Sequence, residues 1–117
     1  MTIAYSEKRR FPRIEKELPL KIRTNECDLV TQTKNISCIG AYCSINRYIR
    51  PLTKLSIILL LPSMTKYKNK TFRIQCKGVV VRIEQRSHHG FDIAIFFNDI
   101  TQRDKEKISK YVTQYIS

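Results

Sequence analysis

The feature that most constrains the fold of this chain is an alternation of apolar and polar residues that extends, with short breaks, from residue 18 to residue 98. Side chains that alternate with a period of two belong to strands with one buried face. No helical stretch interrupts the series, so alternating strands and crossover helices are excluded and antiparallel pairing is expected. The predicted strands cover residues 18–23, 28–37, 41–46, 55–61, 72–84 and 91–97.

Two of these segments depart from simple alternation. Residues 55–61 are apolar on both faces, which predicts a strand that is covered on both sides and ended by Pro62. In residues 72–84 the apolar phase changes around Gly78, which is typical of a β-bulge. Because a bulged strand bends, and bent strands close barrels, the pattern favours a barrel over an open sheet.

The period changes after Asp99. Thr101 precedes Asp104 by three residues, as at a capped helix start, and apolar residues then recur at helical spacing through Ile116. The sequence therefore predicts a mainly β fold, a small six-stranded antiparallel barrel followed by a C-terminal α-helix. The 117 residues suit a single domain, with a basic arm at 1–13, the barrel at 14–98 and the helix at 101–116.

The charge is strongly positive. Twenty-two Lys and Arg against 10 Asp and Glu give a net charge of +12, which favours an anionic partner or serves solubility alone. The longest apolar run, residues 57–61, is far too short to span a membrane, and the N-terminus has no signal-peptide pattern. We therefore expect a cytoplasmic protein without a membrane span.

Several kinds of chemistry lack the residues that they need. The four cysteines have no metal-ligand spacing, so we expect small apolar side chains packed in strands and neither a metal nor a disulfide. His88 and His89 adjoin Gly90 in a predicted turn. There is no nucleophile triad, phosphate loop or paired carboxylate, so we predict that the protein is not an enzyme, has no catalytic residues and needs no cofactor.

Two polar clusters stand apart from the strand pattern. In the first, KRRFPR, Pro12 disfavours a helix, so Arg9 and Arg13 lie on an extended or turning arm that could close on a ligand of nucleotide size. In the second, NISCIG, Asn35 and Ser37 share a strand face and Gly40 permits a turn or a close approach of the backbone. Arginine binds phosphate or a guanine edge in two places, and the Asn amide both donates and accepts.

Taken together, R-x-x-x-R at Arg9 and Arg13 followed by N-x-S-x-x-G at Asn35, Ser37 and Gly40 resembles the PilZ domain. The resemblance extends over nearly the whole chain, including the stretch GVVVR at residues 78–82 and the closing helix. It implies a bacterial receptor for the second messenger cyclic di-GMP.

The resemblance also implies a role for each motif residue. Arg9 and Arg13 are expected to grip guanine edges and phosphates, Asn35 and Ser37 to read a guanine, and Gly40 to keep the barrel surface clear. Lys8 precedes the first motif arginine, a place where a basic residue accompanies two stacked ligand molecules, and Arg10 is a candidate phosphate contact. A domain without an output module must act on an unidentified effector protein, as a monomer or weak dimer.

Two alternatives stay open. One is an adaptor without a ligand that docks through residues 57–61. The other is a basic barrel for single-stranded nucleic acid, with Tyr5, Phe11, Tyr42 and Tyr48 as the available stacking platforms. Nucleic acid is the weaker reading, because the strand phenylalanines share their phase with core aliphatics. We also expect residues 1–13 to be mobile without ligand and to order around it.

Overall fold

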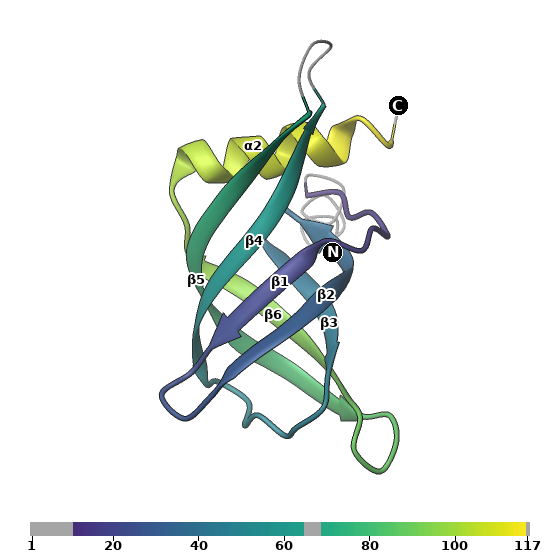
Figure 1. The fold of residues 1–117 in the computed structure, drawn as a ribbon, viewed down its shortest axis with the longest axis vertical. Coiled ribbons are helices and arrows are strands. Elements are labelled where there is room, and N and C mark those ends of the chain that lie inside the picture. The colour runs from purple at the N-terminus through teal and green to yellow at the C-terminus, as the bar shows by residue number, and fades with distance from the viewer. Residues whose placement is uncertain (1–10, 65–68, 117) are drawn as a thin grey trace, which may run out of the picture.

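The computed structural model describes residues 11–64 and 69–116. They form six strands and one helix: β1 (Pro19–Arg23), β2 (Asp28–Ser37), β3 (Gly40–Ile45), β4 (Lys54–Met64), β5 (Asn69–Gln85), β6 (Phe91–Asp99) and α2 (Gln102–Thr113). All strand pairs are antiparallel, and they close in the order β1-β2-β3-β6-β5-β4 (Figure 1). The predicted six-stranded barrel with a C-terminal helix is confirmed.

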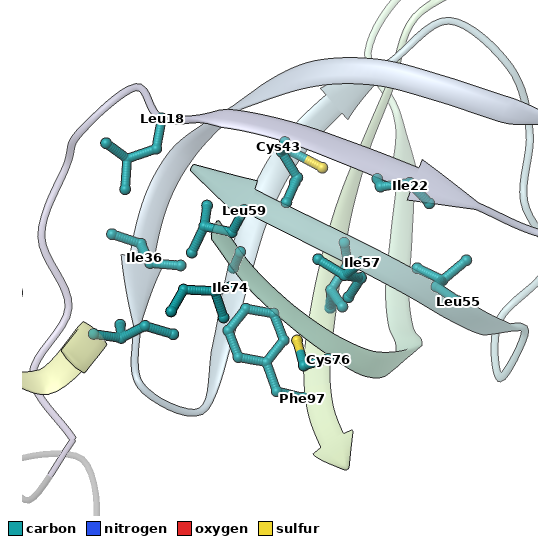
Figure 2. Close-up of a cluster of buried hydrophobic side chains, with 14 of the residues drawn as sticks. Leu18, Ile22, Ile36, Cys43, Leu55, Ile57, Leu59, Ile74, Cys76 and Phe97 are labelled. Carbon is teal, nitrogen blue, oxygen red and sulfur yellow. The ribbon is translucent and has the colours of Figure 1, made fainter. Parts of the chain in front are cut away.

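The inner wall of the barrel is lined by the apolar residues of each alternating strand. Leu59, Ile74 and Phe97, from three different strands, point into the interior in Figure 2 and are almost fully buried. Phe72 and Phe91 pack against this core while remaining partly exposed. The phase of alternation therefore identifies the buried face correctly in most strands.

The register of β5 against β6 shifts at two places, between Lys77 and Val79, at the predicted Gly78, and between Val80 and Arg82. The inward phase changes only at the second place, because Gly78 and Val80 both face the interior and Val81 is the extra residue. Val81 is 52% exposed, although the sequence pattern assigned it to the buried face. Three consecutive valines hide the position of the slip, because each of them suits either face of a strand.

The predictions for β4 are wrong in two respects. The strand continues through Pro62 to Met64, with Pro62 opposite Thr71 of β5. Proline is tolerated there because β1 pairs with β4 only as far as Leu59, so among the described residues one edge of β4 has no strand partner at that point. The strand is also covered on one side only, since Leu60 is 37% exposed on the outer face.

Helix α2 lies across one end of the barrel (Figure 1) and buries Ile108, Tyr111 and Val112. It begins as predicted, because the Thr101 side chain accepts a hydrogen bond from the Asp104 backbone at 3.1 Å. The helix ends at Thr113, earlier than predicted, and Ile116 beyond it is half exposed. No helix among the described residues is long and apolar enough to cross a membrane.

The four cysteines are free thiols. Cys43 and Cys76 lie in strands as expected, and burial raises the pKa of each to about 12. Cys38 is buried in the β2–β3 turn and Cys27 is half-buried in the β1–β2 turn, so neither belongs to a strand.

Candidate functional site

The structure joins the two polar clusters through one short hydrogen bond. Arg13 Nη1 donates to Asn35 Oδ1 at 2.6 Å, across 22 residues of sequence. The backbone beside this contact is fixed, because Ile14 and Ile36 exchange two hydrogen bonds of 3.0 Å each. Arg13 and Asn35, each next to one of these paired residues, are thereby held side by side on the barrel surface.

A buried threonine holds the segment that leads from Arg13 into β1. The Thr33 hydroxyl accepts from the Leu18 backbone N–H at 2.9 Å and donates to the Lys16 carbonyl. Thr33 is only 1% exposed, so these two bonds satisfy a hydroxyl that has no access to water. Thr33 was not among the residues predicted from the sequence.

A hollow of about 330 Å³, which we call the Arg13 hollow, opens beside the Arg13–Asn35 contact. Its floor comes from β3 and β6, and β5 supplies the bulge residue Val81 and the neighbouring Arg82. Val81 and Phe96 expose 52% and 43% of their surface there. Its walls therefore combine two cations with exposed apolar surface, which suits a ligand with both anionic groups and flat rings.

Ser37 and Gly40 shape this site from beneath. The Ser37 hydroxyl is completely buried and accepts from the Ile39 backbone N–H at 3.3 Å, inside the β2–β3 turn. A Cβ on Gly40 would lie 2.2 Å from the Ile95 carbonyl oxygen, so the glycine allows β3 to approach β6 closely. The role of Ser37 in reading a guanine stays a prediction, since its hydroxyl faces the turn in this state.

The remaining predicted site residues, Lys8, Arg9 and Arg10, lie outside the described residues, and so does most of the arm at 1–13 that was expected to order around a ligand. Their contacts stay predictions. Arg13 is the described member of the R-x-x-x-R motif.

Electrostatics at the Arg13 hollow reflect partial removal from water. Burial lowers the pKa of Arg13 from its ordinary value. Tyr42 stands beside Arg82, whose Cζ lies 5.8 Å from the ring centroid, and its hydroxyl donates to Glu84 at 3.4 Å. Burial and the nearby carboxylates of Asp92 and Glu84 raise the pKa of Tyr42.

The sequence pattern of the PilZ domain family matches residues 7–114. The chain belongs to the PilZ domain family.

Solved structures place the same fold in several bacterial proteins. The chain shares 21% identity with the Bacillus subtilis inhibitor of motility (MotI/DgrA), at a TM-score of 0.79 over 92% of this chain and 50% of that one. It shares 10% with the PilZ domain of Escherichia coli YcgR, solved with c-di-GMP, at a TM-score of 0.65 over 92% and 90% of the two chains. With apo MrkH of K. pneumonia it shares 18% identity, at a TM-score of 0.68 over 93% of this chain and 50% of that one.

The chain thus spans about half the length of MotI/DgrA and of MrkH. No curated protein sequence matches it. At these identities the likeness to solved structures concerns the fold of this PilZ domain alone.

One polar centre of the PilZ domain was not found from its sequence. Asp92 lies in β6, where one carboxylate oxygen accepts from Ser44 at 2.5 Å and from Lys34 and Arg86 at 3.2 Å each. Burial raises the pKa of Asp92, but the bonds from Ser44 and Lys34 and the charge of Arg86 outweigh it, so the pKa lies below its ordinary value. Through these contacts Asp92 links β6 to β2 and β3.

Proposed function

We propose that this PilZ domain is a receptor for cyclic di-GMP, and that it binds the dinucleotide at the Arg13 hollow and passes the signal to an effector protein. The observation that carries the proposal is the 2.6 Å bond from Arg13 to Asn35, which unites the two motif clusters at the rim of a hollow. The PilZ domain of YcgR, which has the same fold, was solved with c-di-GMP.

The lining of the hollow suits a cyclic dianion that carries two guanines. Arg13 and Arg82 supply positive charge and planar groups that stack on bases or bind phosphate in two places. Val81 and Phe96 offer exposed apolar surface to a purine face. The Asn35 amide can donate to and accept from a guanine edge once the ligand replaces Arg13 as its partner.

The other motif residues complete the proposed site. Arg9 binds the second guanine or phosphate, and Ser37 supports the guanine beside Asn35. Gly40 has no side chain and so leaves the hollow open to the ligand. Lys8 and Arg10 add phosphate contacts, with Lys8 favouring a stacked pair of ligands. The chemistry is binding and signal transfer without catalysis, and the protein acts as a monomer or weak dimer with an unidentified effector.

The test is isothermal titration of the purified protein with cyclic di-GMP, beside Arg13→Ala, Asn35→Ala and a control, Arg23→Ala. Arg23 pairs with Asp28 at 3.1 Å and does not line the Arg13 hollow. We expect saturable binding with one or two ligands per chain, weakened about tenfold or more by Arg13→Ala, because a contact to a charged group is lost. Binding that Arg13→Ala leaves intact, or that Arg23→Ala weakens equally, would contradict the proposal.

The alternative of a ligand-free adaptor loses part of its basis in the structure. Ile57, Leu59 and Leu61 point into the barrel and are at most 1% exposed, so they offer no docking surface. Absence of any heat of binding for cyclic di-GMP would nevertheless return the search to protein partners.

A further inference from the structure

The end of the barrel opposite α2, which we call the loop end, consists of the three loops at residues 24–27, 46–53 and 86–90 (Figure 1). It contains the one non-glycine residue with a positive φ among the described residues, Leu52 at 70°. The Thr53 backbone N–H donates to the Arg50 carbonyl at 3.2 Å, so residues 50–53 form a tight turn with Pro51 and Leu52 at its centre. A turn with proline first and a positive φ second ordinarily has glycine or asparagine where this chain has leucine.

This conformation is held in place by its neighbours. The Leu52 N–H donates to the Val80 carbonyl at 2.6 Å, and the Val80 N–H donates to the Thr53 carbonyl at 3.1 Å, which ties the turn to β5. Leucine is strained with a positive φ. Its side chain is nevertheless 75% exposed, so burial within the described part of the chain does not offset the strain.

The surroundings of Leu52 combine an exposed aromatic ring with positive charges that have no ion-pair partner among the described residues. Tyr48, in the same loop, is 56% exposed and packs edge-on against Phe91 at 5.8 Å. Arg47, Arg50 and Lys54 line a hollow of about 670 Å³ between this loop and residues 24–27. Among the described residues, none of these three cations has a carboxylate within ion-pair distance, although Glu26 lines the same hollow.

We propose that the loop end docks on an anionic lipid bilayer. Leu52 and Tyr48 enter the boundary between headgroups and acyl chains, while Arg47, Arg50 and Lys54 receive lipid phosphates. A bilayer accepts an apolar side chain that projects from a turn without a complementary pocket, and tyrosine favours the boundary region. Each cation near an anionic leaflet adds attraction. A nucleic acid would use the cations and leave Leu52 in water.

Because the net charge of +12 attracts any anionic surface, the test must locate the contact. The chain has no tryptophan, so Leu52→Trp introduces a single fluorescent reporter at the proposed contact. Ile116→Trp, beyond α2 at the opposite end and 49% exposed, is the matched control. Both are titrated with vesicles of phosphatidylcholine plus phosphatidylglycerol, and with phosphatidylcholine alone.

We expect a blue shift of the Leu52→Trp emission on the mixed vesicles only, and none for Ile116→Trp. Equal shifts for both reporters, a shift for Ile116→Trp alone, or no shift for either would overturn the proposal. Circular dichroism checks that each variant is folded.

A second variant separates insertion from charge. Leu52→Asn keeps every charge and suits a positive φ, so we expect an unchanged or higher melting temperature together with roughly tenfold weaker binding in vesicle sedimentation. Ile116→Asn should bind as the unmodified chain does. Unchanged binding of Leu52→Asn would show that charge alone holds the protein to the vesicle, and would overturn the proposal.

Discussion

Gly40 lies where β3 passes close to the backbone of β6 at the Arg13 hollow. A Cβ at this position would lie 2.2 Å from the backbone oxygen of Ile95, and a backbone atom in a barrel cannot move aside alone. We therefore expect Gly40→Ala to lower the free energy of unfolding by about 2–3 kcal/mol, as overpacking does, in a urea titration.

Gly90→Ala is the matched control. There the nearest atoms are the ends of the Ser87 and Arg86 side chains, at 2.6 and 3.1 Å, which can rotate away. If Gly90→Ala lowered the free energy of unfolding as much as Gly40→Ala, the close approach of β3 to β6 would not be the cause of the destabilisation.

Asp92 gives the barrel a pH-dependent contribution to stability. Its pKa is lower in the folded chain than in the unfolded chain, so its contribution is present above the ordinary aspartate pKa and is lost as the pH falls through the folded value. We expect Asp92→Asn to lower the free energy of unfolding by about 1 kcal/mol at neutral pH, and to reduce its decline below about pH 4.

The comparison is urea unfolding at neutral and acidic pH, with Asp28→Asn as control. Asp28 pairs with Arg23, and both side chains are about half exposed or more. The substitution Asp28→Asn should therefore change the free energy of unfolding little. An identical decline of stability toward acid in the Asp92→Asn variant would refute this assignment.

Arg13 and Asn35 were singled out from two sequence motifs, and the structure joins them by a hydrogen bond. Their role in binding a ligand stays a prediction. Asp92 was missed because its partners Lys34 and Ser44 lie 58 and 48 residues away, and no local pattern reports such pairing. The buried orientation of Ser37 depends on how the hairpin closes, which alternation does not determine.

At the scale of elements, the segment from Arg13 to β1 depends on Thr33. Replacing its hydroxyl by a methyl group leaves the buried Leu18 N–H and the Lys16 carbonyl without this partner. We expect Thr33→Val to lower the free energy of unfolding by about 2 kcal/mol in a urea titration. We also expect it to weaken cyclic di-GMP binding, because the segment that positions Arg13 loosens.

Thr31→Val provides the control on the same strand. The Thr31 hydroxyl donates to the Ser44 carbonyl at 2.6 Å, away from the segment at 14–18. Its loss should reduce stability without changing ligand affinity. If both variants changed ligand affinity equally, Thr33 would not be the residue that positions Arg13.

Strands and helix followed from periodicity because burial on one face leaves a repeat in the sequence. The bulge at Val81 did not, since it falls in a run of valines that fits both faces. The course of β4 through Pro62 depends on β1 ending before that point, which is a property of the tertiary arrangement. Leu60 shows the same limit, because an exposed apolar residue cannot be told from a buried one in an apolar run.

For the whole molecule, the charge of +12 suits two kinds of anionic partner, which differ in how strongly their affinity depends on salt. A small dianion releases few counterions, whereas a nucleic acid strand releases about 0.7–0.9 per neutralised phosphate, so its affinity falls steeply with salt. We expect cyclic di-GMP affinity to decline shallowly between low and high salt in a titration series. A steep decline with the same slope as for a single-stranded oligonucleotide would favour the nucleic-acid reading.

Binding of cyclic di-GMP at the Arg13 hollow specifies both a ligand and a place on the molecule, and amide chemical-shift mapping tests both. Titration of the ¹⁵N-labelled protein with cyclic di-GMP should shift the amides of Asn35, Tyr42, Val81, Arg82 and Phe96 around the Arg13 hollow. The amides of Ser56 and Gln75, beside a separate hollow of about 440 Å³, should stay in place. Shifts confined to that second hollow, or an unchanged spectrum at saturating ligand, would contradict the account.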